Sequence, residues 1–521
     1  MINYLKFLLI LYFLGFSAFA RDNASDLIAP SSLGDTSTDH GAMQWVLRGI
    51  KHNLGLKIGR MEVTNYNDRV IISLANFAPR FSTTARYRES ELAQNRQQYL
   101  ATSEIAPIFE DEVASMELRL EGRMYYGTQV SLYTTTSRLE NTTNQNINTN
   151  TLTGPRFFPE YQTSTQLQVI QPLLKNRGTK VNLAASELAR SEVLGAHYAL
   201  RSELEKTIAQ ILVSYAEAEF GVANLQVKQD AVRLADDLID ENRRRVEEGI
   251  MTSIDVTQAQ ARRAEAMEAV VEARTFLSER ENSLIELTGT EYNFGMDIQI
   301  SESIGDLLPL PQKDRIDIGR SMLASNPIYL AALERVEAEG IRVAYAKNQL
   351  MPQLDIEATL GINGLQDSFG GSYQDFSNRD RPDWSVGLVL SMPLDRSSDR
   401  AQVSLAKRIQ SQALFTAKQT EVQLLILLDN SMHEVEAARE RITLANDSVR
   451  HAEDVLRSEQ RKLSSGLTTS YNVLNQQRDL SFARTRALAA QVELFRAVTQ
   501  LYVAEGSLSK QLNLEVTVAS K

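Results

Sequence analysis

The 521-residue sequence contains no cysteine. Disulfide bonds, thiolate metal sites, thiol nucleophiles and lipid attachment through an N-terminal cysteine are therefore excluded. The five histidines are scattered, and the H-E-x-x-H, G-x-S-x-G and P-loop patterns of common enzyme sites are absent from the sequence. We therefore expect a protein that is not an enzyme, with no catalytic residues, no metal site and no cofactor.

The sequence also lacks a block of basic residues and, beyond its start, any long hydrophobic run. The net charge is −11 and charges of both signs are spread along the chain, so nucleic acid is not an expected partner. No run after residue 20 approaches the roughly 20 apolar residues of a transmembrane helix. Membrane insertion is therefore expected only as a β-barrel, which also satisfies its backbone polar groups in lipid.

The first twenty residues have the pattern of a secretory signal peptide. A lysine precedes an apolar run from Phe7 to Phe16, and the segment ends in Ala18-Phe19-Ala20. This pattern predicts cleavage after Ala20 and export of the chain. The alternative, a membrane anchor, is disfavoured because the run is shorter than a spanning helix needs.

The rest of the chain is a tandem duplication. The segment from Gly249 to Val256 is echoed by the segment from Gly466 to Val473, at an offset of 217 residues, and Leu284 with Gly289 matches Leu501 with Gly506 at the same offset. Further upstream, proline-containing segments at Pro79 and Pro172 match segments at Pro352 and Pro393. A repeat of this length predicts two copies of one structural unit.

Both copies contain an apolar residue at every seventh position over a long stretch. The series are 204, 211, 218, 225, 232, 239 and 246, and 428, 435, 442, 449, 456 and 463. A strict period of seven predicts coiled-coil packing, because a plain amphipathic helix would drift by about 20° per heptad. The stretch 182–248 lacks proline and predicts a helix of about 100 Å, which returns antiparallel over 253–288 after a tight turn.

Between the paired proline markers, the sequence alternates with a period of two. The alternating runs are residues 81–87, 163–169, 354–360 and 386–390, and the outward face of each run begins with its first residue. This pattern predicts two membrane strands per copy and four per chain, although soluble two-stranded ribbons would look similar. Stretches from Thr134 to Gly154 and from Gly361 to Pro382 suit exposed loops. Candidate interfacial aromatics are Tyr125, Tyr126, Tyr133, Phe157, Phe158, Tyr161 and Trp384.

The strand region of the first copy is longer than that of the second. Pro79 and Pro172 lie 93 positions apart, whereas Pro352 and Pro393 lie 41 apart. The extra 52 residues, centred on 89–128, predict either an added hairpin or a cap outside the barrel. Four strands cannot close a barrel, for which about eight are needed, so the chain must assemble as a dimer of eight strands or a trimer of twelve.

These features together resemble the TolC-type outer-membrane efflux family. They are the signal peptide, the duplicated strand-helix-helix unit, the Pro-Leu pair that ends a strand, the G-x-x-T-S turn and the helix start at Asn326-Pro327. The resemblance extends from about Gln44 to Leu512. It implies a mainly α fold with a β-barrel segment, in which long antiparallel coiled-coil helices form an α-barrel and each chain adds four or more membrane strands.

The resemblance also implies a location and a function. The chain is expected to be a homotrimer in the lipid of the cell outer membrane, with helices extending into the periplasm. It would act as the exit duct of a tripartite efflux pump or a type I secretion system, with a periplasmic adaptor and an inner-membrane transporter as partners. The alternative is a coiled-coil surface protein or adhesin without a channel, which would not need two hairpins with matched tips.

Residue roles at the hairpin ends follow from the same resemblance. Adaptor docking is implied for Gly249, Thr252, Ser253, Gly466, Thr469 and Ser470, and a periplasmic aperture for Asp255, Gln258, Asn472 and Asn475. Some relatives carry aspartates where Asn472 and Asn475 stand here, and an arginine where Thr468 stands, so strong cation trapping and a closed-state salt bridge are not expected at those positions.

Structural explanations also exist for these residues. Thr252 and Asp255 fit a helix-capping pattern, and Gly249 and Gly466 fit left-handed helix ends. Arg244, Arg245, Arg461 and Lys462 suit the dipole at a helix C-terminus. The expected division of the chain is a signal peptide (1–20), an N-terminal extension (21–43), a first repeat (44–289; strands 80–170 and hairpin 174–289), a linker (290–325), a second repeat (326–512; strands 353–392 and hairpin 398–512) and a tail (513–521).

Overall fold

The computed structural model describes residues 41–101, 108–142, 159–289, 292, 294, 298, 300, 303–305, 307–310, 314–378 and 382–514. The predicted signal peptide, most of the N-terminal extension, most of the tail, Phe157 and Phe158 lie outside the described residues. The chain divides into two compact units. The first comprises Met1–Asn65, Val193–Glu334 and Phe415–Lys521, and the second comprises Tyr66–Glu192 and Arg335–Leu414.

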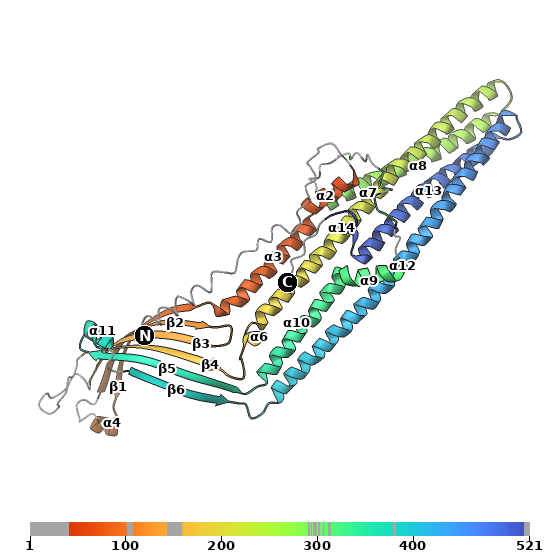
Figure 1. The fold of residues 1–521 in the computed structure, drawn as a ribbon. Helices are drawn as coiled ribbons and strands as arrows, with labels where there is room; N and C mark the ends of the chain where they lie inside the picture. Colours follow the sequence, from red (N-terminus) through yellow and green to blue (C-terminus); the bar gives the residue numbers. More distant parts are fainter. Residues whose placement is uncertain are drawn as a thin grey trace. The chain divides into compact units, whose positions relative to one another are not determined.

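The second unit is built on a six-stranded antiparallel sheet whose strand order follows the chain (Figure 1). The strands are β1 (Arg80–Ala93), β2 (Ile108–Arg123), β3 (Gln129–Asn141), β4 (Glu160–Pro172), β5 (Gln353–Gln366) and β6 (Pro382–Ser391). The alternating segments predicted as strands are confirmed in β1, β4, β5 and β6. The shorter elements are η2 (Ala75–Phe77), α4 (Arg96–Ala101), α6 (Thr179–Asn182) and α11 (Phe369–Asn378).

The expectation of four or more strands per chain is confirmed. The expectation of two strands per copy is wrong for the first repeat, because among the described residues the first repeat contributes four strands and the second contributes two. The whole of β2 lies in the stretch 89–128, for which the sequence predicts either an added hairpin or a cap, and β2 pairs with β1 and β3 as a strand of an added hairpin would. Residues 134–141 were expected to be a loop but belong to β3, since threonine suits a strand as well as a loop. Similarly, Gly361 to Gln366 extend β5, and α11 occupies much of the predicted loop that follows.

Helix α11 packs against β4 and β5 near the ends of these strands (Figure 1). The hydroxyls of Thr163 and Ser372 lie 2.9 Å apart and form a buried hydrogen bond. Gly364 makes this approach possible, because a Cβ at this position would lie 2.3 Å from the carbonyl oxygen of Ser372. Phe369 and Tyr373 of α11 remain exposed.

The first unit contains the two long helical hairpins except for residues 184–192 and 397–414, which belong to the second unit. Helix α7 (Ala184–Glu247) returns as α8 (Ser253–Thr288), and α12 (Ser397–Ser464) returns as α13 (Ser470–Glu505) (Figure 1). Both return helices have 36 residues and their ends are 217 residues apart, as the repeat predicts. The other helices of this unit are α2 (Ala42–His52), α9 (Arg315–Ser325) and α14 (Leu508–Gln511). Helices α3 (Leu54–Leu74) and α10 (Pro327–Gln349) begin in the first unit and end in the second.

The heptad positions form the buried seams of these hairpins. In α7, Leu204, Ile211 and Ala218 are no more than 2% exposed, and in α12 Leu428, Val435 and Leu456 are also buried. The remaining heptad positions are half-buried or buried. The coiled-coil prediction is therefore confirmed for α7 and α12.

The duplication extends to individual hydrogen bonds at the base of each hairpin. Asn53 caps α3 by accepting a bond from the N–H of Leu56 (3.0 Å), and its Nδ2 donates to the carbonyl of Leu287 (2.7 Å). Asn326 caps α10 by accepting from the N–H of Ile328 (2.9 Å), and its Nδ2 donates to the carbonyl of Ala504 (2.9 Å). Each asparagine thus fastens a helix start to the end of a return helix.

The largest hydrophobic core of the first unit lies around these two asparagine contacts. Helix α2 packs against α8 and α9 packs against α13. The fully buried side chains of this core include Tyr215, Leu284, Met322, Leu501 and Leu508. Among the described helices, none is both long enough and apolar enough to cross a membrane.

Candidate functional site

The candidate site is the pair of hairpin tips, residues 248–255 and 465–472, where the long helices reverse direction. Gly249 has a φ of 76° and Gly466 a φ of 70°. In the first tip, the N–H of Ile250 donates to the carbonyl of Arg245 (2.8 Å), and in the second the N–H of Leu467 donates to the carbonyl of Lys462 (2.8 Å). These are Schellman-type helix ends, so the prediction of left-handed glycines is confirmed.

The first tip re-enters a helix through a cap built from Thr252 and Asp255. The N–H of Thr252 donates to Asp255 Oδ2 (3.0 Å), and the Thr252 hydroxyl donates to the same oxygen (2.8 Å). An acidic side chain in the first turn also interacts favourably with the helix dipole. The Asp255 carboxylate is therefore held in place by the turn, and both bonds use one of its two oxygens.

Asn242 of α7 joins the two tips through a buried polar contact. Its side chain is fully buried, and its Oδ1 accepts a hydrogen bond from the hydroxyl of Ser470 (2.6 Å), which is also buried. Its Nδ2 donates to the carbonyl of Asp255 (3.3 Å). One side chain thus contacts the start of both return helices, α8 and α13.

Arg245 makes a second connection between the hairpins. Its Nη1 donates to the carbonyl of Leu463 at the end of α12 (3.2 Å), and its Nε donates to Glu241 (2.7 Å). Hydrogen bonds from Arg245 and then Arg244 lower the pKa of the Glu241 carboxyl. Arg245 is therefore part of the tip contact, whereas the side chain of Arg244 is mostly exposed.

Arg262 connects the two return helices. Its Nη2 donates to Asn475 Oδ1 (3.2 Å), its guanidinium lies 5.8 Å from the ring centre of Tyr471, and its Nη1 donates to Glu265 (2.7 Å). Hydrogen bonds from Asn475 and then Arg262 lower the pKa of the Tyr471 hydroxyl. Tyr471 and Asn475 lie on α13, so this cluster joins the hairpins just beyond their tips.

The residues implied for docking and for the aperture take different positions in the structure. Gly249, Thr252, Ser253, Gly466 and Thr469 are exposed at the tips, whereas Ser470 is buried against Asn242. Among the aperture residues, Gln258 is exposed, Asn472 donates to the Thr468 hydroxyl (3.1 Å) and Asn475 accepts from Arg262. Their roles stay predictions.

Sequence reasoning missed Asn242, Arg262 and Tyr471. A usable signal existed for Asn242, because it follows the heptad position Ile239 by three residues and so stands at a core position of the seam. A polar residue at such a position often specifies register in coiled coils. No comparable local signal marks Arg262, whose partner Asn475 is 213 residues away in the chain.

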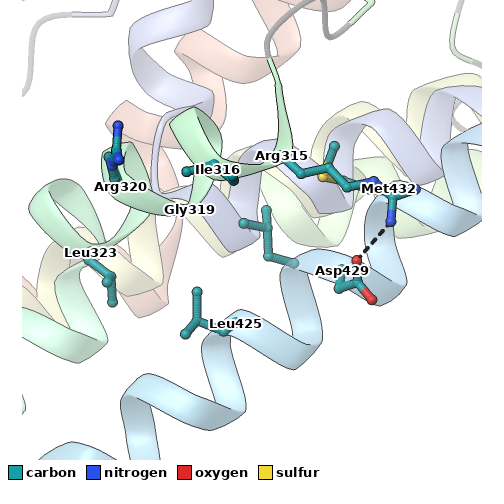
Figure 2. A pocket seen from close by; sticks show the side chains of 9 residues that line it. Arg315, Ile316, Gly319, Arg320, Leu323, Leu425, Asp429 and Met432 are labelled. Atoms are coloured by element: carbon teal, nitrogen blue, oxygen red, sulfur yellow. Dashed lines mark hydrogen bonds and ion pairs between the residues drawn. The ribbon is translucent and has the colours of Figure 1, made fainter.

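A separate open groove of about 370 Å³ lies between α9 and α12 (Figure 2). Its lining is mostly apolar and includes Ile316, Leu323, Leu425 and Met432. Arg315 stands at one end and pairs with Asp429 (3.0 Å) of α12. Within the described residues, no cluster of histidine, aspartate and glutamate side chains could hold a metal ion.

Comparisons with known proteins agree with this geometry. The family model of outer membrane efflux proteins matches residues 128–290 and 319–507. The outer membrane efflux protein BepC of Brucella suis biovar 1 (strain 1330) is 26% identical over 363 residues, which cover 67% of this chain and 74% of BepC. The cobalt-zinc-cadmium resistance protein CzcC of Cupriavidus metallidurans (strain ATCC 43123 / DSM 2839 / NBRC 102507 / CH34) is 21% identical over 344 residues, or 65% of this chain and 76% of CzcC.

Solved structures share the fold. The outer-membrane channel OprN has a TM-score of 0.65 at 17% identity, covering 94% of this chain and 96% of OprN. CusC has a TM-score of 0.64 at 13% identity, covering 90% of this chain and 92% of CusC. The family match spans both repeats and their helical hairpins, and it confirms the resemblance found in the sequence. The chain therefore belongs to the outer membrane efflux protein family and is an outer-membrane efflux channel protein.

Proposed function

We propose that three copies of this chain assemble into one duct that crosses the outer membrane and continues through the periplasm. In this role the protein is the exit duct of a tripartite efflux pump or a type I secretion system. A periplasmic adaptor and an inner-membrane transporter deliver the cargo. The main supporting observation is the sheet, because β1 and β6 each have only one neighbouring strand within the described chain.

Unpaired sheet edges favour assembly in a membrane. The backbone N–H and C=O groups of an edge strand have no water to bind in lipid, so each edge needs a partner strand. A single open sheet cannot provide one for both edges, whereas neighbouring copies can. All residues of β6 are exposed in the single chain, as an edge that pairs with another copy would be.

Exposed apolar side chains on the helices also support assembly. Ile58, Met61 and Ile71 of α3 are 65–68% exposed, and Phe415 of α12 is 72% exposed. Long helices usually bury such side chains against a partner, and exposed apolar patches mark interaction surfaces. In the proposed trimer, these faces pack against the helices of neighbouring copies.

In the proposed duct, the hairpin tips contact the adaptor and surround the periplasmic entrance. Gly249, Thr252, Ser253, Gly466 and Thr469 supply the contact surface, and Ser470 holds the second tip in position through Asn242. Asp255 lines the aperture, and three copies give a ring of three carboxylates. Because the cap uses only Oδ2 of Asp255, the second carboxylate oxygen is available to a cation.

Single-channel recordings in planar bilayers test the channel and the aperture ring together. The purified protein should form pores, and external divalent cations should block them. Asp255→Asn removes the charge but keeps a capping acceptor, so it should weaken the block as much as Asp255→Ala does. Unchanged cation sensitivity in both variants would remove this role from Asp255, and the absence of any pore would refute the channel itself.

Bulky substitutions test docking. Thr252→Trp and Thr469→Trp should impair export while trimer abundance in the outer membrane stays unchanged. Glu268→Trp places the same side chain at an exposed position of α8 away from the tip and serves as the matched control. Loss of the trimer in the tip variants, or equal impairment by the control, would count against a docking role.

A further inference from the structure

The extra residues of the first repeat add β2, and β2 together with β1 forms one edge of the sheet. This edge could form a cap beside the membrane wall, or it could be part of that wall. We infer that β1 and β2 belong to the wall, so that each chain contributes six strands and the trimer is enclosed by eighteen. The number eighteen rests on the proposed trimer, whereas the six-strand contribution of each chain rests on the sheet itself.

β1 and β2 are both paired along their lengths. β1 pairs with β2 from Arg80↔Glu121 to Ala93↔Ile108, and β2 pairs with β3 from Arg123↔Gln129 to Asp111↔Asn141. A tilted membrane strand needs about 9–11 residues, and β1 has 14 residues and β2 has 16. A cap beside the wall would require the whole ladder between β2 and β3 to open.

One row of residues crosses all six strands and is apolar throughout. The register pairs Phe81 with Leu120, Leu120 with Leu132, Leu132 with Leu167, Leu167 with Leu360 and Leu360 with Trp384. Directly paired residues point to the same side of a sheet. Phe81 at one edge and Trp384 at the other are 65% and 70% exposed, so this row offers lipid a continuous apolar band that includes β1 and β2.

The adjacent row faces the other side and carries no large apolar side chain. It consists of Ser82, Arg119, Tyr133, Gln166, Gly361 and Asp383. Arg119 lies 5.1 Å from the ring centre of Tyr133, and the Tyr133 hydroxyl donates to Gln166. Gln166 extends over Gly361, where a Cβ would lie 2.7 Å from its Cγ. This side has the polar character of a water-filled lumen.

The polar row also corrects the role expected for one aromatic residue. Tyr133 was a candidate for the membrane interface, but its ring faces the polar side together with Arg119. Trp384 lies on the apolar side, where it pairs with Leu360, and Tyr161 faces the same side because it is six residues from Leu167 on β4. On that side, α11 adds exposed Phe369 and Tyr373 near the ends of the strands, where membrane proteins concentrate aromatic side chains.

The edges of a six-strand contribution allow the wall to close. Because all neighbouring strands are antiparallel and their number is even, β1 and β6 run in opposite directions. β6 of one copy can therefore continue the antiparallel pattern with β1 of the next. At a strand spacing of about 4.8 Å and a tilt of about 40°, eighteen strands give a wall diameter of about 36 Å, against about 24 Å for twelve.

Cysteine pairs can test which strands meet between copies, because the chain has no cysteine of its own. One cysteine replaces Ser82, Thr84 or Arg86 of β1, and the other replaces Ser385, Gly387 or Val389 of β6. All six positions are on the polar side, and the panel covers several registers. Oxidation in outer membranes of cells that express the full-length protein should give a disulfide-linked trimer in at least one pair.

The matched control panel joins the same β6 positions to Ser131, Thr135 or Ser137 of β3. We expect no disulfide between copies here, because β2 and β4 already flank β3. Links from β6 to β3 would overturn the inference and leave the trimer intact. The inference would also be overturned if a lysine cross-linker shows a trimer but no cysteine pair between β1 and β6 forms a disulfide. A chain that stays monomeric with the lysine reagent would instead refute the proposed function.

Spin labels on β2 provide a second measurement. Labels replacing Met116 and Leu118 should be accessible to oxygen dissolved in lipid, and labels replacing Ser115 and Glu117 should be accessible to a water-soluble nickel complex. A cap outside the membrane would expose all four labels to the nickel complex, and that result would overturn the inference.

Discussion

The contact between Asn242 and Ser470 permits a quantitative test of how the two hairpin tips are held together. Asn242→Leu keeps a side chain of similar size but removes both hydrogen bonds of the amide. The hydroxyl of Ser470, a residue that is 1% exposed, then loses its oxygen acceptor 2.6 Å away and keeps only the weak acceptor Met251 Sδ at 3.8 Å. Leaving a buried polar group unsatisfied costs about 1–3 kcal/mol, so local opening of the tips should become about 5- to 150-fold more frequent.

Hydrogen exchange followed by mass spectrometry measures this opening. In the purified protein, peptides covering the two tips should exchange faster by that factor, and peptides around Tyr215 should be unchanged. The second substitution Ser470→Ala should restore part of the protection, because removing both partners of a hydrogen bond costs less than removing one.

Asp240 provides the matched control, because it lies on α7 two residues before Asn242 and its side chain is 68% exposed. Its carboxylate accepts a bond from Arg243 on its own helix (3.3 Å), and such exposed pairs contribute only about 0.3–0.5 kcal/mol. Asp240→Leu should therefore change tip exchange less than threefold. Equal acceleration in both variants, or none in Asn242→Leu, would refute the assignment of Asn242 as the contact between the tips.

Three further predictions concern stability and assembly. Burial raises the pKa of the Glu205 carboxyl, so the folded protein should lose stability as the pH rises from 4.5 through that raised pKa. Glu205→Gln should therefore show a smaller loss of Tm between acidic and neutral pH than the unmodified protein, and equal losses would contradict this. Gly249→Ala should destabilise the first turn by about 1–2 kcal/mol, because the φ of 76° at this position is unfavourable for a residue with a Cβ. The added Cβ meets no atom within 4 Å, so the effect measures backbone strain alone. Hydrogen exchange at the tip should become faster, and an unchanged rate would argue against strain. Phe415→Ser should lower the yield of cross-linked trimer without lowering the helix content measured by circular dichroism, and an unchanged yield would exclude this side chain from the contact between copies.

The helical part of the fold could be predicted because its signals are local or repeated. Leu204 and Ile211 recur with a period of seven, and the offset of 217 places both tips in the same register. The hydrogen bond from Asn53 to the carbonyl of Leu287 was not predicted, although the equivalent bond in the second copy is made by Asn326, which the sequence marks as a helix start. The repeat comparison used prolines and glycines as markers, and a capping asparagine in one copy is informative only when its equivalent is known.

The number of strands could not be obtained from the repeat, because β2 has no counterpart in the second copy. Its apolar positions Met116, Leu118 and Leu120 alternate with Glu117, Arg119 and Glu121. This is the pattern of a membrane strand, but a stretch without an equivalent reads equally well as a surface insertion. In β3, threonines at 134, 135 and 136 occupy both sides of the strand and hide the alternation. Only the observed pairing resolves these two cases.

The equal lengths of α8 and α13 restrict how this protein can change during evolution. Each return helix is fixed at both ends, by a tight turn at its start and at its end by a glycine packed against the backbone of His52 or Asn326. Deleting one residue would rotate the remaining seam by about 100° and shorten the helix by about 1.5 Å. Length variation among relatives should therefore come in whole heptads, and a change in one arm should be matched in the arm that packs beside it.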